Sequence, residues 1–216
     1  MIRVVAGLAG GRALAVPRGA GTRPTSERAR EGLFSTLEAL HGPLSGARLA
    51  DLYAGSGAVG LEALSRGAGH ALFVECDAQA LRTLRTNVRS LGLPGAEVVA
   101  GKVRPVVAAG PPAGAAYDVV FLDPPYAVPD AELGTVLSGL RSGGWLRPGA
   151  LVAVERPSRG AALAWPRGYE GLRARRYGEG TLWYGRATGE EAPGSESRPP
   201  SYGGRGCDVQ ARSVGR

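Results

Sequence analysis

Residues 51–60, DLYAGSGAVG, combine an acid with a glycine turn that could hold a nucleotide-like ligand. Gly55, Gly57 and Gly60 have the G-x-G-x-x-G spacing of dinucleotide sites, in which the backbone approaches a ligand closely and presents amide N–H groups to it. Asp51 precedes the first glycine by four residues, and a carboxylate there repels phosphate but suits an ammonium group. The stretch therefore favours the methionine part of S-adenosylmethionine over a dinucleotide, and a plain connecting turn remains the third interpretation.

A second acid, Glu75, lies at the end of the predicted strand 71–76, 24 residues after Asp51. A carboxylate at this place accepts hydrogen bonds from ribose hydroxyls in dinucleotide and adenosylmethionine sites alike. Glu75 therefore indicates a nucleoside ligand and does not choose between the two.

The tetrapeptide Asp123-Pro124-Pro125-Tyr126 directly follows the apolar run YDVVFL. Its two prolines remove two backbone donors, so carbonyl groups and the Asp123 carboxylate remain as acceptors. Such a pocket suits a planar base with an exocyclic amino group, whose hydrogens would bond to Asp123 and to the Pro124 carbonyl while the base stacks on Tyr126. These four residues are the predicted catalytic residues, and an ordinary turn is the alternative.

The elements that must position these residues alternate between strands and helices from Arg48 onward. Strands are predicted at 48–53, 71–76, 96–100, 117–122 and 150–155, and helices at 57–66, 78–91, 102–109 and 130–143. This alternation predicts a mostly parallel sheet with helices on both faces, the architecture of a Rossmann-like α/β fold. Because ligands bind at the carboxyl ends of strands near the switch point, the fourth strand should lie beside the first and bring Asp123 to the glycine turn.

Two hairpins are predicted at the ends of this pattern. Residues 170–177 and 181–187 should pair antiparallel and complete a seven-stranded sheet, and residues 2–7 and 12–17 should form an N-terminal β-hairpin around Gly10-Gly11. A helix should begin after Pro24, with Thr25 or Ser26 as its cap. We therefore expect an N-terminal extension at 1–24, one α/β domain at 25–187 and a disordered tail at 188–216, which has almost nothing to bury.

The charge of the chain suggests a polyanionic partner. Twenty-six Lys and Arg against nineteen Asp and Glu give a net charge of +7. GC-rich coding would explain the preference for Arg over Lys, but not the excess of bases over acids. Residues 1–30 hold six Arg and one acid, Glu27, so the N-terminal extension is the segment predicted to face nucleic acid.

Membrane and metal sites are not expected. The chain has no run of about eighteen apolar residues that could span a bilayer. Cys76 and Cys207 have neither metal-ligand spacing nor the density of a disulfide scaffold. These features predict a cytoplasmic protein with no membrane association and no metal.

Five segments together resemble the bacterial 16S rRNA guanine-N2 methyltransferases of the RsmD type: RPTSERAREGLF, DLYAGSGAVGLEALSRGA, VEC, DVVFLDPPY and RRYGEGTLWY. The similarity covers roughly residues 2–187. It implies a class I methyltransferase that uses S-adenosyl-L-methionine, releases S-adenosyl-L-homocysteine and methylates the exocyclic N2 of one guanine in 16S rRNA, the guanine-966 type site. The implied partner is 16S rRNA within the 30S subunit or an assembly intermediate, and we expect the enzyme to be a monomer.

The resemblance also assigns the donor-binding residues. Asp51 and the turn after it would hold the methionine part of the donor, the turn consisting of Tyr53, Ala54, Gly55, Ser56 and Gly57. Glu75 would take the ribose hydroxyls. Cys76 would line the adenine pocket, and the Val103 backbone N–H would hold the adenine ring.

Residues at the N-terminal end would contribute both to the cofactor site, with Arg23 and Thr25 as predicted cofactor-binding residues, and to RNA binding. By the resemblance, Arg23-Pro24-Thr25 would close over the site. The basic hairpin would meet RNA phosphates, with Arg3, Arg12 and Arg18 as the predicted RNA-binding residues.

One position departs from the family. After the third strand the family has an acid or amide that accepts a hydrogen bond from the adenine amino group, whereas this chain has Gly101-Lys102-Val103. Lys102 offers donors only and cannot accept from that amino group. Either the Val103 amide holds the adenine alone, or Lys102 points to solvent.

Three other functions remain open at this point. An adenine-N6 methyltransferase acting on DNA or on another RNA could share the DPPY tetrapeptide, because it recognises an amino group, but the chain has no room for an added target-recognition region. A nicotinamide oxidoreductase would keep the glycine turn and leave Asp51 and DPPY unexplained. A non-catalytic RNA-binding protein would explain only the charge.

Overall fold

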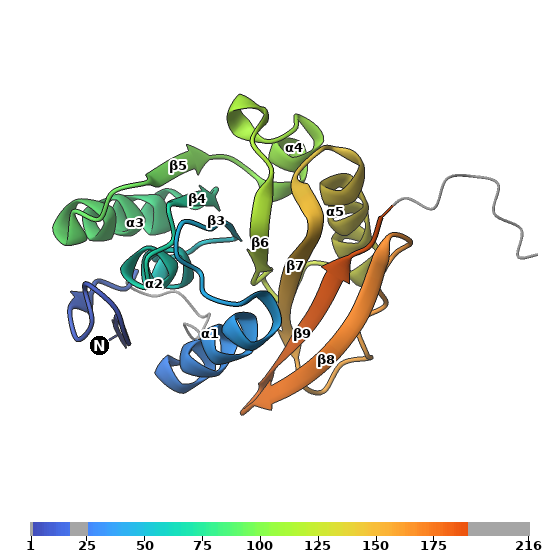
Figure 1. The fold of residues 1–216 in the computed structure, drawn as a ribbon, viewed down its shortest axis with the longest axis horizontal. Helices are drawn as coiled ribbons and strands as arrows, with labels where there is room; N and C mark the ends of the chain where they lie inside the picture. The colour runs from blue at the N-terminus through green and yellow to red at the C-terminus, as the bar shows by residue number, and fades with distance from the viewer. Residues whose placement is uncertain (1, 18–25, 190–216) are drawn as a thin grey trace, which may run out of the picture.

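The computed structural model describes residues 2–17 and 26–189 and is built around a seven-stranded sheet (Figure 1). The strands are β3 (Arg48–Leu52), β4 (His70–Glu75), β5 (Ala96–Ala100), β6 (Tyr117–Leu122), β7 (Leu146–Pro157), β8 (Tyr169–Tyr177) and β9 (Gly180–Ala187). Their order is β5-β4-β3-β6-β7-β9-β8; the first five pair parallel, and β9 pairs antiparallel with both β7 and β8. The predicted mostly parallel sheet with its closing hairpin is confirmed.

Helices cover both faces of this sheet, as predicted. Those in the described ranges are α1 (Glu27–His41), α2 (Ala58–Ser65), α3 (Ala78–Leu91), α4 (Val103–Ala108), α5 (Asp130–Ser142) and the 3-10 turn η1 (Pro112–Gly114). α4 and α5 pack on one face, against strand residues such as Leu52. α1 and α2 pack on the opposite face, against residues such as Leu49, and α3 joins α2 around Phe73. Among the described residues, no helix is long and apolar enough to cross a membrane.

The start of α1 confirms one of the two predicted caps. The Ser26 hydroxyl accepts a hydrogen bond from the Ala29 N–H at 3.1 Å, and Glu27 lies in the first turn, where a negative charge favours the helix dipole. Thr25 lies outside the described residues, as do the predicted boundary at residues 24 and 25 and the predicted tail from residue 190 onward.

The N-terminal hairpin is present, but its strands are shorter than predicted. β1 (Ile2–Arg3) and β2 (Ala13–Leu14) form only two residue pairs. The backbone between them turns instead toward α2, where Glu62 and Ser65 accept hydrogen bonds from the amides of Val5, Ala6 and Ala9. Backbone donors need a partner but not necessarily a strand, so α2 replaces most of the expected ladder. Figure 1 shows this hairpin beside α2 and α3, at the end of the molecule opposite β8.

Candidate functional site

The glycine turn after β3 contains three residues in the left-handed backbone region. Tyr53 has a φ of 67°, which a residue with a Cβ seldom adopts, and Gly55 and Gly57 have φ values of 55° and 80°. The N–H groups of Tyr53 and Ala54 both donate to the Val74 carbonyl of β4, at 3.1 and 3.0 Å. The neighbouring strand therefore holds the start of the turn in place.

The three glycines of the motif have different surroundings. A Cβ added at Gly60 would lie 2.3 Å from the Phe73 ring, and one added at Gly57 would lie 2.3 Å from Leu84 Cδ1. These two glycines allow α2 to pack closely on β4 and α3. A Cβ added at Gly55 would meet no described atom within 4 Å. Gly55 is thus the position of the three at which a ligand can approach the backbone.

Asp51 is buried beneath this turn. Its side chain faces α2, and its Oδ2 accepts a hydrogen bond from the Gly60 N–H at 2.9 Å. Burial raises the pKa of Asp51 to about 7; the Gly60 hydrogen bond opposes this shift and the charge of Glu75 adds to it. A carboxyl that titrates near neutral pH would be driven to its ionised form by an ammonium group. The Asp51 carboxylate also supports the first turn of α2, a role that the sequence did not suggest.

Glu75 joins the end of β4 to the glycine turn. Its Oε2 accepts from the Gly55 N–H at 2.8 Å, and its Oε1 accepts from the N–H groups of Cys76 and Asp77 at 2.7 and 2.8 Å. An ionised carboxylate has about four acceptor positions, so about one remains open. Glu75 can accept one ribose hydroxyl as it stands, and a second hydroxyl would have to replace one of the amides.

The end of β5 lies beside Glu75, where the predicted adenine pocket should be. The Gly101 N–H donates to the Glu75 carbonyl at 2.9 Å, and Val103 begins α4 with a buried side chain. The Val103 amide belongs to the first turn of the helix, where amides lack intrahelical acceptors. Lys102 is exposed at the N-cap position and makes no side-chain cap hydrogen bond. Cys76 is exposed and unpaired in the described part of the chain.

Asp123 lies directly beside the start of the glycine turn. β6 pairs with β3, as predicted, with Leu122 opposite Leu52. The Asp123 N–H then donates to the Leu52 carbonyl at 3.3 Å, one residue before Tyr53 begins the turn. The strand order thus brings together two motifs that lie about seventy residues apart in the sequence.

The rest of the DPPY segment forms a short loop above the sheet. Pro124 is buried, whereas Pro125 and Tyr126 are exposed, with 61% of Tyr126 accessible to solvent. The Val128 N–H donates to the Pro125 carbonyl at 2.8 Å and closes the loop. Partial burial and the carboxylates of Glu155, Asp123 and Glu179 raise the pKa of Tyr126, so its hydroxyl stays protonated at neutral pH. The Tyr126 ring is thus accessible to a ligand, and its role as the base platform stays a prediction.

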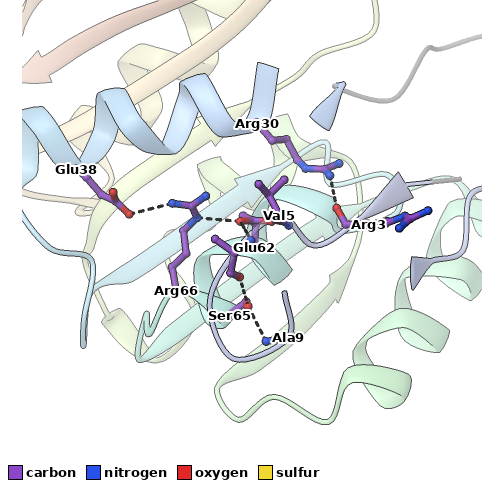
Figure 2. Close-up of polar contacts among 9 residues, drawn as sticks. Arg3, Val5, Ala9, Arg30, Glu38, Glu62, Ser65 and Arg66 are labelled. Atoms are coloured by element: carbon purple, nitrogen blue, oxygen red, sulfur yellow. Dashed lines mark hydrogen bonds and ion pairs between the residues drawn. The ribbon is translucent and has the colours of Figure 1, made fainter. Parts of the chain in front are cut away.

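Polar contacts fasten the N-terminal hairpin to α2 (Figure 2). Glu62 has a fully buried side chain that accepts from the N–H groups of Val5 and Ala6, at 2.6 and 3.0 Å, and from Arg66 Nε at 2.8 Å. Arg66 also pairs with Glu38 of α1 at 3.2 Å. One buried carboxylate therefore holds the hairpin, α2 and, through Arg66, α1.

The predicted RNA-binding arginines differ in their surroundings. The backbone of Arg3 docks on α1: its carbonyl accepts a hydrogen bond from the buried Arg30, and its N–H donates to Glu27 Oε1 at 3.1 Å. Arg3 is nevertheless exposed to solvent. Arg12 donates to the carbonyls of Ser90 and, at 3.0 Å, Leu91, at the end of α3. Arg12 therefore fastens the hairpin to α3. Arg18 and the segment Arg23-Pro24-Thr25 lie outside the described residues.

Asn87 of α3 connects the hairpin to the glycine turn, and it was not predicted from the sequence. Its Nδ2 donates to the Ser56 carbonyl at 2.9 Å and to the Ala15 carbonyl at 3.0 Å, and its Oδ1 accepts from the Ala15 N–H at 2.9 Å. Ser56 is itself buried. Asn87 lies in the mostly polar helix sequence LRTNVRSL, which contains no signal that distinguishes it from its neighbours.

Glu62 and Arg156 were also not predicted, although Glu62 had a signal. Glu62 is the single charged residue in the apolar helix AVGLEALS, and a lone buried acid predicts a specific partner. Arg156 of β7 donates to the Val128 carbonyl at 3.1 Å and to Asp130 Oδ1 at 2.8 Å. It holds the end of the DPPY loop from the neighbouring strand.

Comparison with known proteins places the chain in a defined family. The family model described as "Conserved hypothetical protein 95" matches residues 2–186. Ribosomal RNA small subunit methyltransferase D of Escherichia coli K12 is 38% identical over 154 residues, which are 71% of this chain and 74% of that protein. A solved hypothetical protein of Thermus thermophilus is 38% identical with a TM-score of 0.71, covering 85% of this chain and 98% of the other. TrmN from the same organism shares the fold, with 24% identity, a TM-score of 0.58 and coverage of 72% and 48%.

Proposed function

Because the chain belongs to the family described as conserved hypothetical protein 95, the RsmD family of rRNA methyltransferases, we propose that it methylates the exocyclic N2 of one guanine in 16S rRNA. The fold is the Rossmann-like fold of class I methyltransferases, and the methyl donor in this proposal is S-adenosyl-L-methionine. The substrate position would be the guanine-966 type site that the family resemblance implies.

One observation supports this proposal most strongly. Asp123 follows β6 next to the point at which β3 enters the glycine turn, and the Asp123 N–H is bonded to Leu52. A base held by the DPPY loop would lie beside a donor held by the turn. A dinucleotide site would share this strand order but would leave Asp51 and the DPPY segment without a role, and a non-catalytic RNA-binding protein would explain only the charge.

The chain's own residues provide suitable contacts for the donor. Asp51 would attract the ammonium group, the open space in front of Gly55 would admit the methionine part, and Glu75 would accept from the ribose. The Val103 amide and the exposed Cys76 border the place expected for adenine. When bound, S-adenosylmethionine supplies a methyl group on a sulfonium centre, and the leaving group is the neutral thioether of S-adenosyl-L-homocysteine, so no acid is needed to protonate it.

Asp123 and the loop after it would activate the guanine. The lone pair of N2 is delocalised into the ring, which makes the amino group a weak nucleophile. Hydrogen bonds from its two protons to the Asp123 carboxylate and the Pro124 carbonyl would localise that lone pair, and stacking on Tyr126 would orient the base. Asp123 could then take the proton that N2 loses as the new C–N bond forms.

The RNA contacts in this proposal come from outside the sheet. The N-terminal extension, residues 1–24, would face the RNA, with Arg3 and Arg18 as phosphate contacts and Arg12 mainly docking the hairpin. The target guanine must be unpaired or extruded, because side chains cannot read the deep groove of paired RNA. We propose a cytoplasmic monomer that acts on the 30S subunit or an assembly intermediate.

Transfer of tritium from labelled S-adenosylmethionine to 30S particles, naked 16S rRNA and DNA tests the proposal. The wild-type enzyme should label 30S particles, and digestion of the product should yield N2-methylguanosine. Asp123→Ala should reduce transfer by about a hundredfold to a thousandfold, a loss of the size expected for essential catalytic hydrogen bonds, while donor binding measured by calorimetry stays within about threefold.

Asp118→Asn is the control for this variant, because Asp118 lies at the opposite end of the same strand. Its carboxylate accepts from the Arg48 N–H and from Arg147, and the amide keeps an acceptor for the former. It should retain most of the wild-type turnover. Full turnover of Asp123→Ala, or N6-methyladenosine as the product, would overturn the assignment of guanine N2.

A further inference from the structure

A hollow of about 210 Å³ lies beside the DPPY loop. It is lined by Tyr126, by Pro157 at the end of β7, and by Arg159, Arg176 and Glu179. Arg176 belongs to the end of β8, and Glu179 lies in the turn between β8 and β9. Among the described residues, the lining includes the predicted base platform, Tyr126, but none of the proposed donor-binding residues. The hollow is therefore on the substrate side of the site.

The charged groups of the hollow are available to a ligand. Arg159, Arg176 and Glu179 are all exposed. Arg176 Nε donates to the Gly178 carbonyl at 3.1 Å, which positions this guanidinium, and its terminal nitrogens make no hydrogen bond within the described residues. Arg159 makes no hydrogen bond or ion pair within residues 2–17 and 26–189. Two guanidinium groups at one hollow have the charge and the donors that suit a phosphate.

The other lining groups point to more than a phosphate. The Tyr126 ring and Pro157 provide an apolar surface on which a base or sugar can pack. Glu179 accepts hydrogen bonds only, so it disfavours a bare anion and suits a ligand that also carries hydroxyl or amino donors. A ribonucleotide has all three features: a phosphate, a planar base and the 2′-hydroxyl.

The size of the hollow also limits what it can hold. Pockets for complete small-molecule ligands usually measure roughly 300–1,000 Å³. At about 210 Å³, this open hollow suits one unit of a longer ligand that is anchored elsewhere. A strand of RNA whose target base lies on the other side of Tyr126 is such a ligand.

We propose that the hollow binds the nucleotide adjacent to the target base in the RNA strand. Arg159 and Arg176 bind its phosphate, Tyr126 and Pro157 pack against it, and Glu179 accepts from its hydroxyl or amino groups. Tyr126 separates this nucleotide from the target base and helps to keep the target unstacked. The hollow thereby contributes to the choice of sequence context around the target. The proposal rests on the proposed function, namely that RNA is the substrate.

The test is the double variant R159Q/R176Q, assayed as the full chain with 30S particles and labelled S-adenosylmethionine. The KM for 30S particles should rise about tenfold or more, since two charged hydrogen bonds are removed, while kcat and the Kd for the donor stay within about threefold. The slope of log K for RNA binding against log salt should fall by about 0.7 for each phosphate that the variant no longer binds.

Arg175→Gln is the matched control. Arg175 is exposed on the same strand, next to Arg176, and neighbouring strand residues point to opposite faces. Like each single change in the double variant, it removes one positive charge, but outside the hollow, and it should change KM by less than about threefold. An Arg175→Gln effect as large as that of the double variant would overturn the proposal, because charge alone would then explain both.

Two further outcomes separate this proposal from the proposed function. If the wild-type enzyme methylates 30S particles and the double variant keeps its KM, or loses kcat with an unchanged KM, the hollow does not bind the neighbouring nucleotide and the proposed function stands. If the wild-type enzyme binds S-adenosylmethionine but labels no RNA, the proposed function fails, and this proposal fails with it.

Discussion

Replacing Glu62 by Gln should loosen the N-terminal hairpin and lower the free energy of unfolding by about 3–5 kcal/mol. The buried carboxylate accepts from three donors: the N–H groups of Val5 and Ala6 and the Nε of Arg66. Glutamine keeps the shape of the side chain but replaces one acceptor oxygen with an NH2 group. At least one of the three donors would then face another donor.

The magnitude follows from what the substitution leaves unpaired. A buried donor without an acceptor costs about 1–3 kcal/mol. Loss of one partner from a buried ion pair costs about 3–5 kcal/mol. The ion-pair part of the cost for Glu62→Gln should lie below this range, because the Arg66 side chain is 14% exposed to solvent and still forms its ion pair with Glu38. The unpaired donor and the weakened ion pair together give the predicted loss of about 3–5 kcal/mol, which is a large share of the roughly 5–15 kcal/mol that stabilises a domain. Detachment of residues 2–17 from α2 would relieve part of this cost.

Two measurements check this prediction. Urea denaturation gives the global loss, and hydrogen exchange at the amides of Val5 and Ala6 reports local detachment, which should speed exchange by about a hundredfold for 3 kcal/mol. The control is Glu38→Gln in the same ion network. The Glu38 side chain is 41% exposed, and its polar partner within residues 2–17 and 26–189 is Arg66, so this variant should cost less than about 1 kcal/mol.

The reasoning about Glu62 would be refuted by equal losses for the two variants, or by unchanged exchange at Val5 and Ala6. Either result would mean that the hairpin is held by its apolar contacts and not by the buried carboxylate. If the prediction holds, Glu62→Gln should also weaken binding to 30S particles while leaving donor binding within about threefold, since the side-chain hydrogen bonds of Glu62 within the described ranges go to Val5, Ala6 and Arg66.

Three more predictions concern the donor side. Burial raises the pKa of Asp51 from 3.8 to about 7, so the contribution of the protonated Asp51 to stability should be present below pH 4 and lost as the pH rises through 7. Donor affinity, measured by calorimetry, should increase about tenfold or more from pH 5 to pH 7 as Asp51 ionises, and Asp51→Asn should remove this pH dependence. Gly60→Ala should lower the free energy of unfolding, measured by urea denaturation, by about 1–3 kcal/mol, because the added Cβ would clash with Phe73. Gly134→Ala is the control in α5: its Cβ would meet open space, and it should raise the free energy of unfolding by about 0.4–1 kcal/mol. Asn87→Asp cannot donate to Ser56 and should weaken donor binding about tenfold; unchanged affinity would exclude a link between α3 and the turn.

The strands, the helices and two of the motifs were predictable from the sequence because their signals are local. Alternating apolar runs and glycine turns predicted each element of the main sheet, and the order of the elements predicted that β6 lies beside β3. The DPPY segment could therefore be placed at the glycine turn from the sequence. The roles of the three glycines could not be distinguished from the sequence. In the structure, Phe73 and Leu84 occupy the space next to Gly60 and Gly57, whereas Gly55 faces open space.

The contacts between remote segments were not predictable, and they explain why the N-terminal hairpin strands are shorter than predicted. The strand predicted at 150–155 is also wrong in extent, since β7 runs from Leu146 to Pro157. The N-terminal hairpin is short because its backbone amides pair with Glu62 and Ser65, more than fifty residues later. Every buried amide needs an acceptor, but the sequence does not reveal which distant side chain supplies it. The same holds for Asn87, whose partners lie 31 and 72 residues away.

By itself, the sequence determined the fold class, the family and the two motifs at the strand ends, because period, turn chemistry and spacing act over short stretches of chain. Only the tertiary structure decided how Asp51 and Glu75 are occupied by the amides of Gly60 and Gly55, how the hairpin is fastened, and that a hollow with Arg159 and Arg176 adjoins Tyr126. These features depend on hydrogen bonds and packing between segments that meet only after the sheet has formed.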